Sequence, residues 1–233
     1  MSFIQKAFFG VALLALAACD VPTETSVPAP VSTALAPAPS QLSGRQAARQ
    51  FVGVVETVEP VAERECRARA SGMNCDFKIV IDDRPGQPVN AYQTLDTSGQ
   101  PIIAFTIALI ADVRNADELA FVMGHEAAHH IAGHIARQQR NAQAGALVFA
   151  GLAALTGADA QVLQNAGEIG AQVGARTYSK DYEIEADILG TVITKKAGYD
   201  PVRGAAFFSR IPDPGGRFLG THPPNAQRIE AVR

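Results

Sequence analysis

The chain has 233 residues, of which 47% are hydrophobic and 18% are charged, so it can bury a core and is not a disordered protein. Its formal net charge of −3 at pH 7 excludes a strongly basic nucleic-acid binder, and we expect no nucleic-acid partner. Its three cysteines are an odd number, which in an exported protein leaves one cysteine to be explained.

The first 18 residues have the pattern of a bacterial lipoprotein signal peptide. Lys6 precedes an uncharged apolar run over 7–18, which is shorter than the roughly 20 residues that a membrane-spanning helix needs. The run ends in Leu-Ala-Ala before Cys19, which resembles the lipobox, in which the cysteine is lipidated and the leader is removed. An ordinary signal peptide with a cysteine near its cleavage site is the alternative.

Residues 19–42 are predicted to be a tether between this lipid and a folded domain. The stretch is rich in Pro, Ala, Ser and Thr and has no hydrophobic periodicity, which is typical of an extended chain without a core. Asp20 resembles an inner-membrane retention signal, with the outer membrane as the alternative. We therefore expect a lipid-anchored protein of the bacterial envelope that faces the periplasm, with its folded domain over 43–233.

The other two cysteines, Cys66 and Cys75, are predicted to form a disulfide. Outside the cytoplasm, two cysteines that close a short loop are more often bonded than free. The turn-forming sequence SGMN over 71–74 can bring the two sulfurs together. A reduced pair is the alternative.

Hydrophobic spacing predicts a mixed domain in which a small sheet precedes most of the helices. Apolar residues at helical spacing indicate a helix over 45–70, with a bend at Pro60. Three runs of strand-forming residues follow, over 77–81, 89–95 and 102–106. A short helix is expected over 107–113.

The next predicted helix carries the sequence HEAAH. Asn115 opens a capping-box pattern before it. At about 100° per residue, His125 and His129 lie about 40° apart and one turn along, so both imidazoles can bind one metal ion. Glu126 projects to the side, where it can accept a proton from a water molecule that the ion polarises. A histidine-rich helix face without a metal is the alternative.

A catalytic zinc takes three protein ligands, so this pair needs a third. This helix is predicted to continue through HEAAHHIAGH, so His130 and His134 point about 140° and about 180° away from His125, and neither can share the ion. Glu183 and Asp187 lie four residues apart on one face of a later helix, so Glu183 can bind the metal while Asp187 hydrogen-bonds a ligand imidazole. A solvated acidic helix is the alternative interpretation of that segment.

Three motifs occur in the order HEAAHHIAGH, YSKDYEIEADILG and GTHPPNAQRI, and together they resemble the HtpX-like zinc metallopeptidases. Prenyl-protein endopeptidases and periplasmic assembly-quality-control proteases belong to the same family. The sequence VNAY over 89–92 is similar to the family's Asn-Ala-aromatic strand ahead of the active-site helix. The resemblance covers roughly residues 52–232.

The resemblance implies a fold of the α+β class, that of the zincin-like gluzincins. Such a domain is mainly helical, with a sheet of three or more strands beside the active-site helix. The family's site implies one Zn²⁺ per chain, with Glu126 acting as base and then as acid. Its implied zinc ligands are His125, His129 and Glu183.

His222, in the sequence GTHPP, is a further candidate catalytic residue. It can stabilise the oxyanion of the reaction, or it can occupy the open zinc position and hold the enzyme latent, as loops do in some relatives. An exposed loop histidine without a catalytic role is the third interpretation.

Residues 141–158 carry no charge, and membrane-embedded relatives have spans in this region. The strongly apolar part has about 12 residues, which is too short for a span. We therefore predict a buried or interface helix, with shallow membrane contact as the alternative.

These patterns predict a membrane-tethered zinc metalloendopeptidase that hydrolyses peptide bonds in envelope proteins as part of proteolytic quality control. Its partners are protein or peptide substrates and a membrane reached through the N-terminal lipid. A substrate strand is expected to pair with the edge of the small sheet, at the strand over 102–106. The alternative is a chaperone-like or adaptor lipoprotein that binds clients in the same cleft without cutting. No pattern indicates the oligomeric state.

Overall fold

The computed structural model describes residues 42–213, 215 and 222–233. The predicted signal peptide over 1–18, Cys19 and the tether up to residue 41 lie outside the described residues. Within these, the chain forms helices around one small sheet, so the prediction of a mainly helical domain with a three-stranded sheet is confirmed.

Helix α1 (Gly44–Arg69) opens the described part of the domain. The Gln46 side chain accepts a hydrogen bond from the backbone N–H of Ser43 at 3.0 Å, which stabilises the first turn. Phe51, Val54 and Val58 recur at helical spacing and are buried, so this face packs into the core. Pro60 lies inside the helix.

The sheet has the strand order β1-β3-β2, with β1 (Lys78–Asp82), β2 (Ala91–Leu95) and β3 (Pro101–Thr106). The central strand β3 is parallel to β1 and antiparallel to β2. Because β3 is paired on both sides, the prediction that a substrate strand pairs with it is wrong. The edge strand next to the helix that carries HEAAH is β2.

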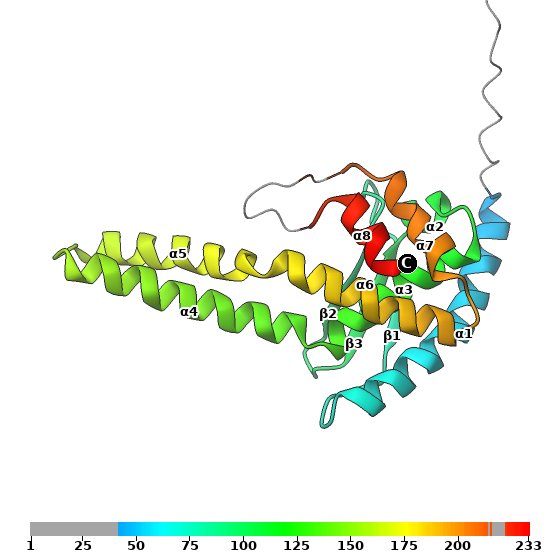
Figure 1. Ribbon diagram of the computed structural model, residues 1–233, viewed down its shortest axis with the longest axis horizontal. Coiled ribbons are helices and arrows are strands. Elements are labelled where there is room, and N and C mark those ends of the chain that lie inside the picture. Colours follow the sequence, from blue (N-terminus) through cyan, green and yellow to red (C-terminus); the bar gives the residue numbers. More distant parts are fainter. Residues whose placement is uncertain (1–41, 214, 216–221) are drawn as a thin grey trace, which may run out of the picture. The chain divides into compact units, whose positions relative to one another are not determined.

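Helix α3 (Ala116–Ile131), which carries the HEAAH sequence, is the buried centre of the domain and packs against α1 and β2 (Figure 1). It follows the short helix α2 (Ile107–Asp112). The remaining elements around it are α6 (Ser179–Lys196), α7 (Pro201–Ala205), the 3₁₀ helix η1 (Ala206–Ser209) and α8 (Asn225–Val232).

The start of α3 follows its predicted cap only in part. The side chain of Asn115 accepts a hydrogen bond from the backbone N–H of Glu118 at 3.0 Å, as predicted. The Glu118 carboxylate accepts instead from the backbone N–H of Arg114 at 2.9 Å, and it also pairs with Arg210. A buried ion pair to the C-terminal part of the chain therefore replaces one half of the capping box.

The prediction of one continuous helix through HEAAHHIAGH is wrong. Helix α3 ends at Ile131, and Gly133 has a φ of +66°, a left-handed conformation that glycine adopts without a steric penalty. Helix α4 (His134–Leu155) then starts in a new direction. Angles counted along one continuous helix therefore do not apply to His134.

Helices α4 and α5 (Ala160–Thr177) run side by side as a hairpin (Figure 1). A Cβ on Gly145 would lie 2.1 Å from the carbonyl oxygen of Gly170, so the two backbones are in direct contact. The segment over 141–158 was predicted to be a buried or interface helix, and the buried form is wrong, because Leu147 and Leu155 on α4 are 76% and 85% exposed. Among the described residues, none of the helices combines the length and hydropathy of a membrane-spanning segment.

Cys66 and Cys75 form a disulfide that joins the last turn of α1 to the segment before β1. The two residues are nine positions apart, and in the chain-entropy model a bond that closes such a loop stabilises a protein by about 2–3 kcal/mol.

We expect the double variant Cys66→Ala/Cys75→Ala to lower the free energy of unfolding by about 2–3 kcal/mol, because its unfolded chain is freer. Equilibrium denaturation in urea measures the change. The control is wild-type protein unfolded in urea with a reductant present, which should show a similar loss in the free energy of unfolding. A change below about 0.5 kcal/mol in both samples would contradict the prediction.

Candidate metal centre

Two glycines bring helices α3 and α6 into backbone contact at the site. A Cβ on Gly190 of α6 would lie 2.9 Å from the backbone nitrogen of His125, and a Cβ on Gly124 of α3 would lie 2.9 Å from the carbonyl oxygen of Gly190. Any larger residue would push the helices apart. This close crossing places the acidic face of α6 opposite the histidines of α3.

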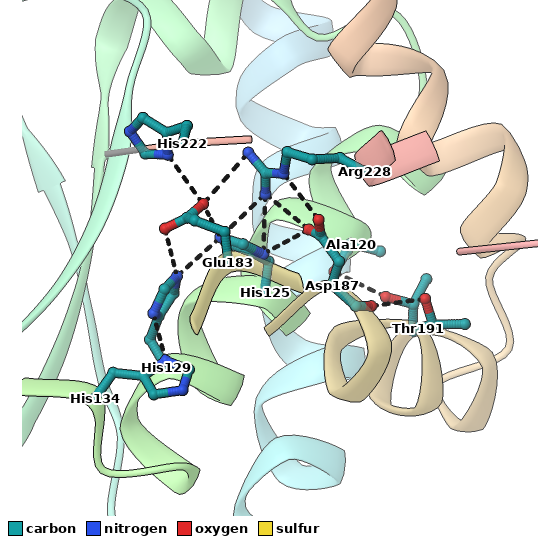
Figure 2. A network of polar contacts seen from close by, with 10 residues as sticks. Ala120, His125, His129, His134, Glu183, Asp187, Thr191, His222 and Arg228 are labelled. Atoms are coloured by element: carbon teal, nitrogen blue, oxygen red, sulfur yellow. Dashed lines mark hydrogen bonds and ion pairs between the residues drawn. The ribbon is translucent and has the colours of Figure 1, made fainter. Parts of the chain in front are cut away.

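The side chains of His125, His129 and Glu183 converge on one point (Figure 2), and one ligand atom from each lies within 4.8 Å of the others. The two Nε2 atoms of the histidines are 3.0 Å apart. The Glu183 carboxylate oxygens lie 3.6 Å from Nε2 of His125 and 3.4 Å from Nε2 of His129. All three side chains are largely buried.

This set of donor atoms fits a zinc ion. Ligands bound at about 2.0–2.1 Å around a tetrahedral zinc lie ~3.3 Å from one another, close to the separations above. Oε2 of Glu183 is buried and accepts no well-aligned hydrogen bond from a described residue, although nitrogens of His222 and Arg228 lie 3.0 and 3.4 Å from it, so a lone pair remains for a cation. The donors, two imidazole nitrogens and a carboxylate, are those of a catalytic zinc site with an open fourth position.

Asp187 lies where the sequence analysis expects it, behind His125. Its Oδ1 is 2.9 Å from Nδ1 of His125, so the imidazole donates to the carboxylate and turns Nε2 toward the site. Burial and the Arg228 cation lower the pKa of His125, but hydrogen bonds to Asp187 and Glu183 outweigh them and raise it to about 9. Without a metal, His125 therefore binds a proton that a zinc ion must displace.

Arg228 of α8 was not singled out from the sequence, although it lies in the GTHPPNAQRI motif. Its Nε and one terminal nitrogen donate to the two carboxylate oxygens of Asp187 at 2.8 and 2.7 Å (Figure 2). Burial alone would raise the pKa of Asp187, but the hydrogen bonds from Arg228 and His125 hold it below its usual value. Asp187 therefore stays ionised behind His125.

His134, which the sequence analysis excluded as a metal ligand by its angle, lies against the other candidate ligand imidazole, that of His129. Its Nδ1 is 2.8 Å from Nδ1 of His129, on the side of that ring that faces away from the site. Burial outweighs the hydrogen bond to Glu185 and lowers the pKa of His134 to about 4, so the imidazole is neutral. His134 is thus not placed as a ligand but behind one. The remaining histidine of the motif, His130, bonds to the carbonyl oxygen of Asn74 instead.

A cavity of about 810 Å³ opens at the three converging side chains. Glu126 lines it next to His125, and so do residues 88–93 of the β2 segment. Glu126 is partly exposed, as a group must be that exchanges protons with water. The cavity is therefore lined by the three candidate ligand side chains, by a carboxylate that can act as a base, and by the edge of the sheet.

His222 reaches the same site from the segment before α8. Its Nδ1 lies 3.0 Å from Oε2 of Glu183, and its side chain is 51% exposed (Figure 2). Burial alone would raise the pKa of Glu183, but contacts with His125, His129 and His222 lower it well below its usual value. The contact places His222 at the mouth of the site.

We expect Gly190→Val to prevent zinc binding, because its side chain would separate α6 from α3 and move Glu183 away from the two histidines. Zinc content after dialysis measures this. Gly151→Val is the matched control: it is also a glycine inside a helix, and its Cβ would meet no atom within 4 Å. Equal zinc content in the two variants would contradict the role of the glycine crossing.

Comparison with known proteins agrees with this geometry. The model of peptidase family M48 matches residues 50–233. Metalloprotease YcaL of Escherichia coli (strain K12) is 27% identical over 158 residues, which cover 64% of this chain and 62% of the relative. The beta-barrel assembly-enhancing protease of Escherichia coli O157:H7 is 30% identical over 141 residues (51% of this chain, 27% of the relative).

The mitochondrial metalloendopeptidase OMA1 of Schizosaccharomyces pombe is 29% identical over 128 residues (51% of this chain, 36% of the relative). The chain spans less than two thirds of the length of each of these three relatives.

Proposed function

Since this chain belongs to peptidase family M48, we propose that it is a zinc metalloendopeptidase that cleaves proteins of the bacterial envelope. One zinc ion binds to His125, His129 and Glu183, and Glu126 is the catalytic base. The observation that carries this proposal is the convergence of the three ligand side chains in a cavity that Glu126 also lines.

When bound, zinc supplies a Lewis acid that polarises the scissile carbonyl and lowers the pKa of water. The chain's own residues do the rest of the chemistry. The Glu126 carboxylate accepts a proton from the attacking water and later donates it to the nitrogen of the leaving amine. Asp187 and Arg228 hold the His125 ring in place throughout.

The substrate binds in extended form along β2. This strand pairs only with β3 among the described strands, so its outer edge has free backbone donors and acceptors. A substrate strand that pairs with this edge lies in the cavity beside Glu126. Backbone pairing accepts many sequences, which suits an enzyme that acts on misassembled proteins.

The envelope location rests on two further observations. The lipobox sequence before Cys19 predicts a lipid anchor, and one relative is named as a beta-barrel assembly-enhancing protease. We therefore place the enzyme on the periplasmic side of a bacterial membrane, in proteolytic quality control. Asp20 favours the inner membrane, with the outer membrane as the alternative. Labelling with a radioactive fatty acid tests the anchor: wild type should take up the label and Cys19→Ala should not.

Casein cleavage by purified wild-type protein tests the proposed activity. We expect cleavage that the chelator 1,10-phenanthroline stops and that added zinc restores. A protein that binds zinc but does not cleave casein would favour a latent enzyme or the alternative, a chaperone-like or adaptor lipoprotein that binds clients in the same cavity.

His222→Ala separates the two active roles of His222. Because His222 contacts Glu183 at the mouth of the site, we expect the variant to change casein turnover. A fall of about tenfold or more assigns it to oxyanion stabilisation, and a rise assigns it to an inhibitory position on the zinc. Unchanged turnover at equal zinc content would contradict both roles and leave an exposed loop histidine.

A further inference from the structure

We propose that His134 is a positioning residue, which holds the ring of His129 with its Nε2 toward the metal and is itself oriented by Glu185. The proposal rests on the proposed function, because it assigns His129 as a zinc ligand. It adds two residues to the site that lie outside the three converging side chains and outside the HEAAH motif.

The three side chains form a chain of hydrogen bonds that runs away from the site. Nδ1 of His129 and Nδ1 of His134 are 2.8 Å apart, and Nε2 of His134 lies 3.1 Å from Oε2 of Glu185. His134 is 5% exposed, so water does not compete for these bonds. The break at Gly133 makes the contact possible, because it turns the first residue of α4 back toward the end of α3.

The directions of these bonds follow from the chemistry of the groups. An ionised carboxylate only accepts, so Nε2–H of His134 donates to Glu185. Nε2 of His129 faces the metal position and needs its lone pair to bind the ion, so the proton of this ring is on Nδ1, and Nδ1 of His134 accepts it. His129 is thereby fixed in the tautomer whose Nε2 carries a lone pair, and that lone pair faces the metal position. Asp187 does the same for His125.

Packing around His134 holds this chain of hydrogen bonds, which we call the relay, in one geometry. The ring of His134 stacks on that of Tyr182 with centroids 4.6 Å apart and an angle of 16° between the planes. Arg137 donates to Glu185 at 2.6 Å, and its guanidinium carbon lies over the Tyr182 ring, 4.3 Å from the ring centroid. Tyr182 precedes the proposed ligand Glu183, so the same cluster supports two of the three ligands.

Two substitutions of similar size separate the relay from simple packing. In His134→Asn, the side-chain oxygen can occupy the place of Nδ1 and still accept from His129. In His134→Gln, the amide can occupy the place of Nε2 and bond to Glu185, but the acceptor for His129 is lost. If His134 acts through its hydrogen bond to His129, His134→Gln should weaken zinc retention strongly and His134→Asn only slightly. If His134 acts through packing alone, no such order is expected.

The measurement is the rate at which zinc-loaded full-length protein releases zinc to an excess of chelator. We expect His134→Gln to release zinc about 10–100-fold faster than wild type, and His134→Asn to stay within about threefold. His130→Gln is the matched control: His130 is on the neighbouring turn and is equally buried, but its hydrogen bond goes to the backbone of Asn74. It should release zinc at the wild-type rate.

Equal rates for the Asn and Gln variants, or a wild-type rate for Gln, would overturn the proposal. Wild-type protein that binds no zinc would instead refute the proposed function. The hydrogen bond itself is tested in either case by NMR, because an N–H···N bond transmits a scalar coupling between the ¹⁵N nuclei. We expect this coupling between the Nδ1 atoms of His129 and His134 in wild type and its loss in His134→Gln; its absence in wild type would overturn the relay.

Discussion

Glu126→Gln is expected to lower casein turnover by about 10³-fold while zinc stays bound. The amide has the size of the carboxylate but cannot accept the proton of the attacking water. Glu126 is not among the three side chains whose ligand atoms converge, so the metal should not be lost with the charge. Turnover at equal zinc content, measured from initial rates of casein cleavage, gives the effect.

The control for Glu126→Gln is its thermal stability, which shows whether the variant is still folded. Glu126 is partly exposed, and its charge raises the pKa of Arg228 less than Asp187 and Glu183 do, so the thermal midpoint of Glu126→Gln should stay close to that of wild type. Cleavage at the wild-type rate by a zinc-loaded variant would contradict the assignment of Glu126 as base.

Arg228→Met is expected to lower the free energy of unfolding by about 3–5 kcal/mol. Asp187 has 0% exposure and receives two hydrogen bonds from Arg228, so the variant leaves a buried carboxylate with only His125 as its partner. An uncompensated buried charge costs far more than the loss of a surface ion pair. Urea denaturation of the metal-free protein measures the change.

Arg233→Met is the matched control, since Arg233 is also near the end of α8 but pairs with Glu230 in solvent, where both side chains are more than half exposed. Its loss should cost no more than about 0.5 kcal/mol. The double variant Arg228→Met/Asp187→Leu should recover part of the lost stability, because it also removes the buried carboxylate that Arg228→Met leaves without its main partner. If Arg228→Met costs as little as Arg233→Met, the ion pair does not support the site.

The parts of the site that sequence analysis predicted are those that depend on local geometry. His125 and His129 lie one helical turn apart, and so do Glu183 and Asp187, so spacing alone indicates which side chains share a face. These two faces meet because α3 and α6 cross closely at Gly124 and Gly190. Spacing does not predict that crossing, and only the order of motifs shared with a known family indicated it.

The parts that were missed depend on contacts between distant segments or on a local break. Gly133 ends α3, and its position was a usable signal, because glycine is common just after a helix. A break there brings His134 onto His129. Arg228 meets Asp187 only because α8 packs on α6, and no local pattern reports that contact. The exposed face of α4 was misjudged because uncharged residues usually indicate burial.

Zinc content after dialysis, measured by mass spectrometry on wild type, Glu126→Gln and Glu183→Ala, tests the central claim most directly. The claim is that His125, His129 and Glu183 hold one zinc ion while Glu126 acts beside it. We predict close to one zinc per chain in wild type and in Glu126→Gln, and nearly none in Glu183→Ala. A wild-type protein without zinc, or a Glu183→Ala variant that keeps a full equivalent, would contradict it.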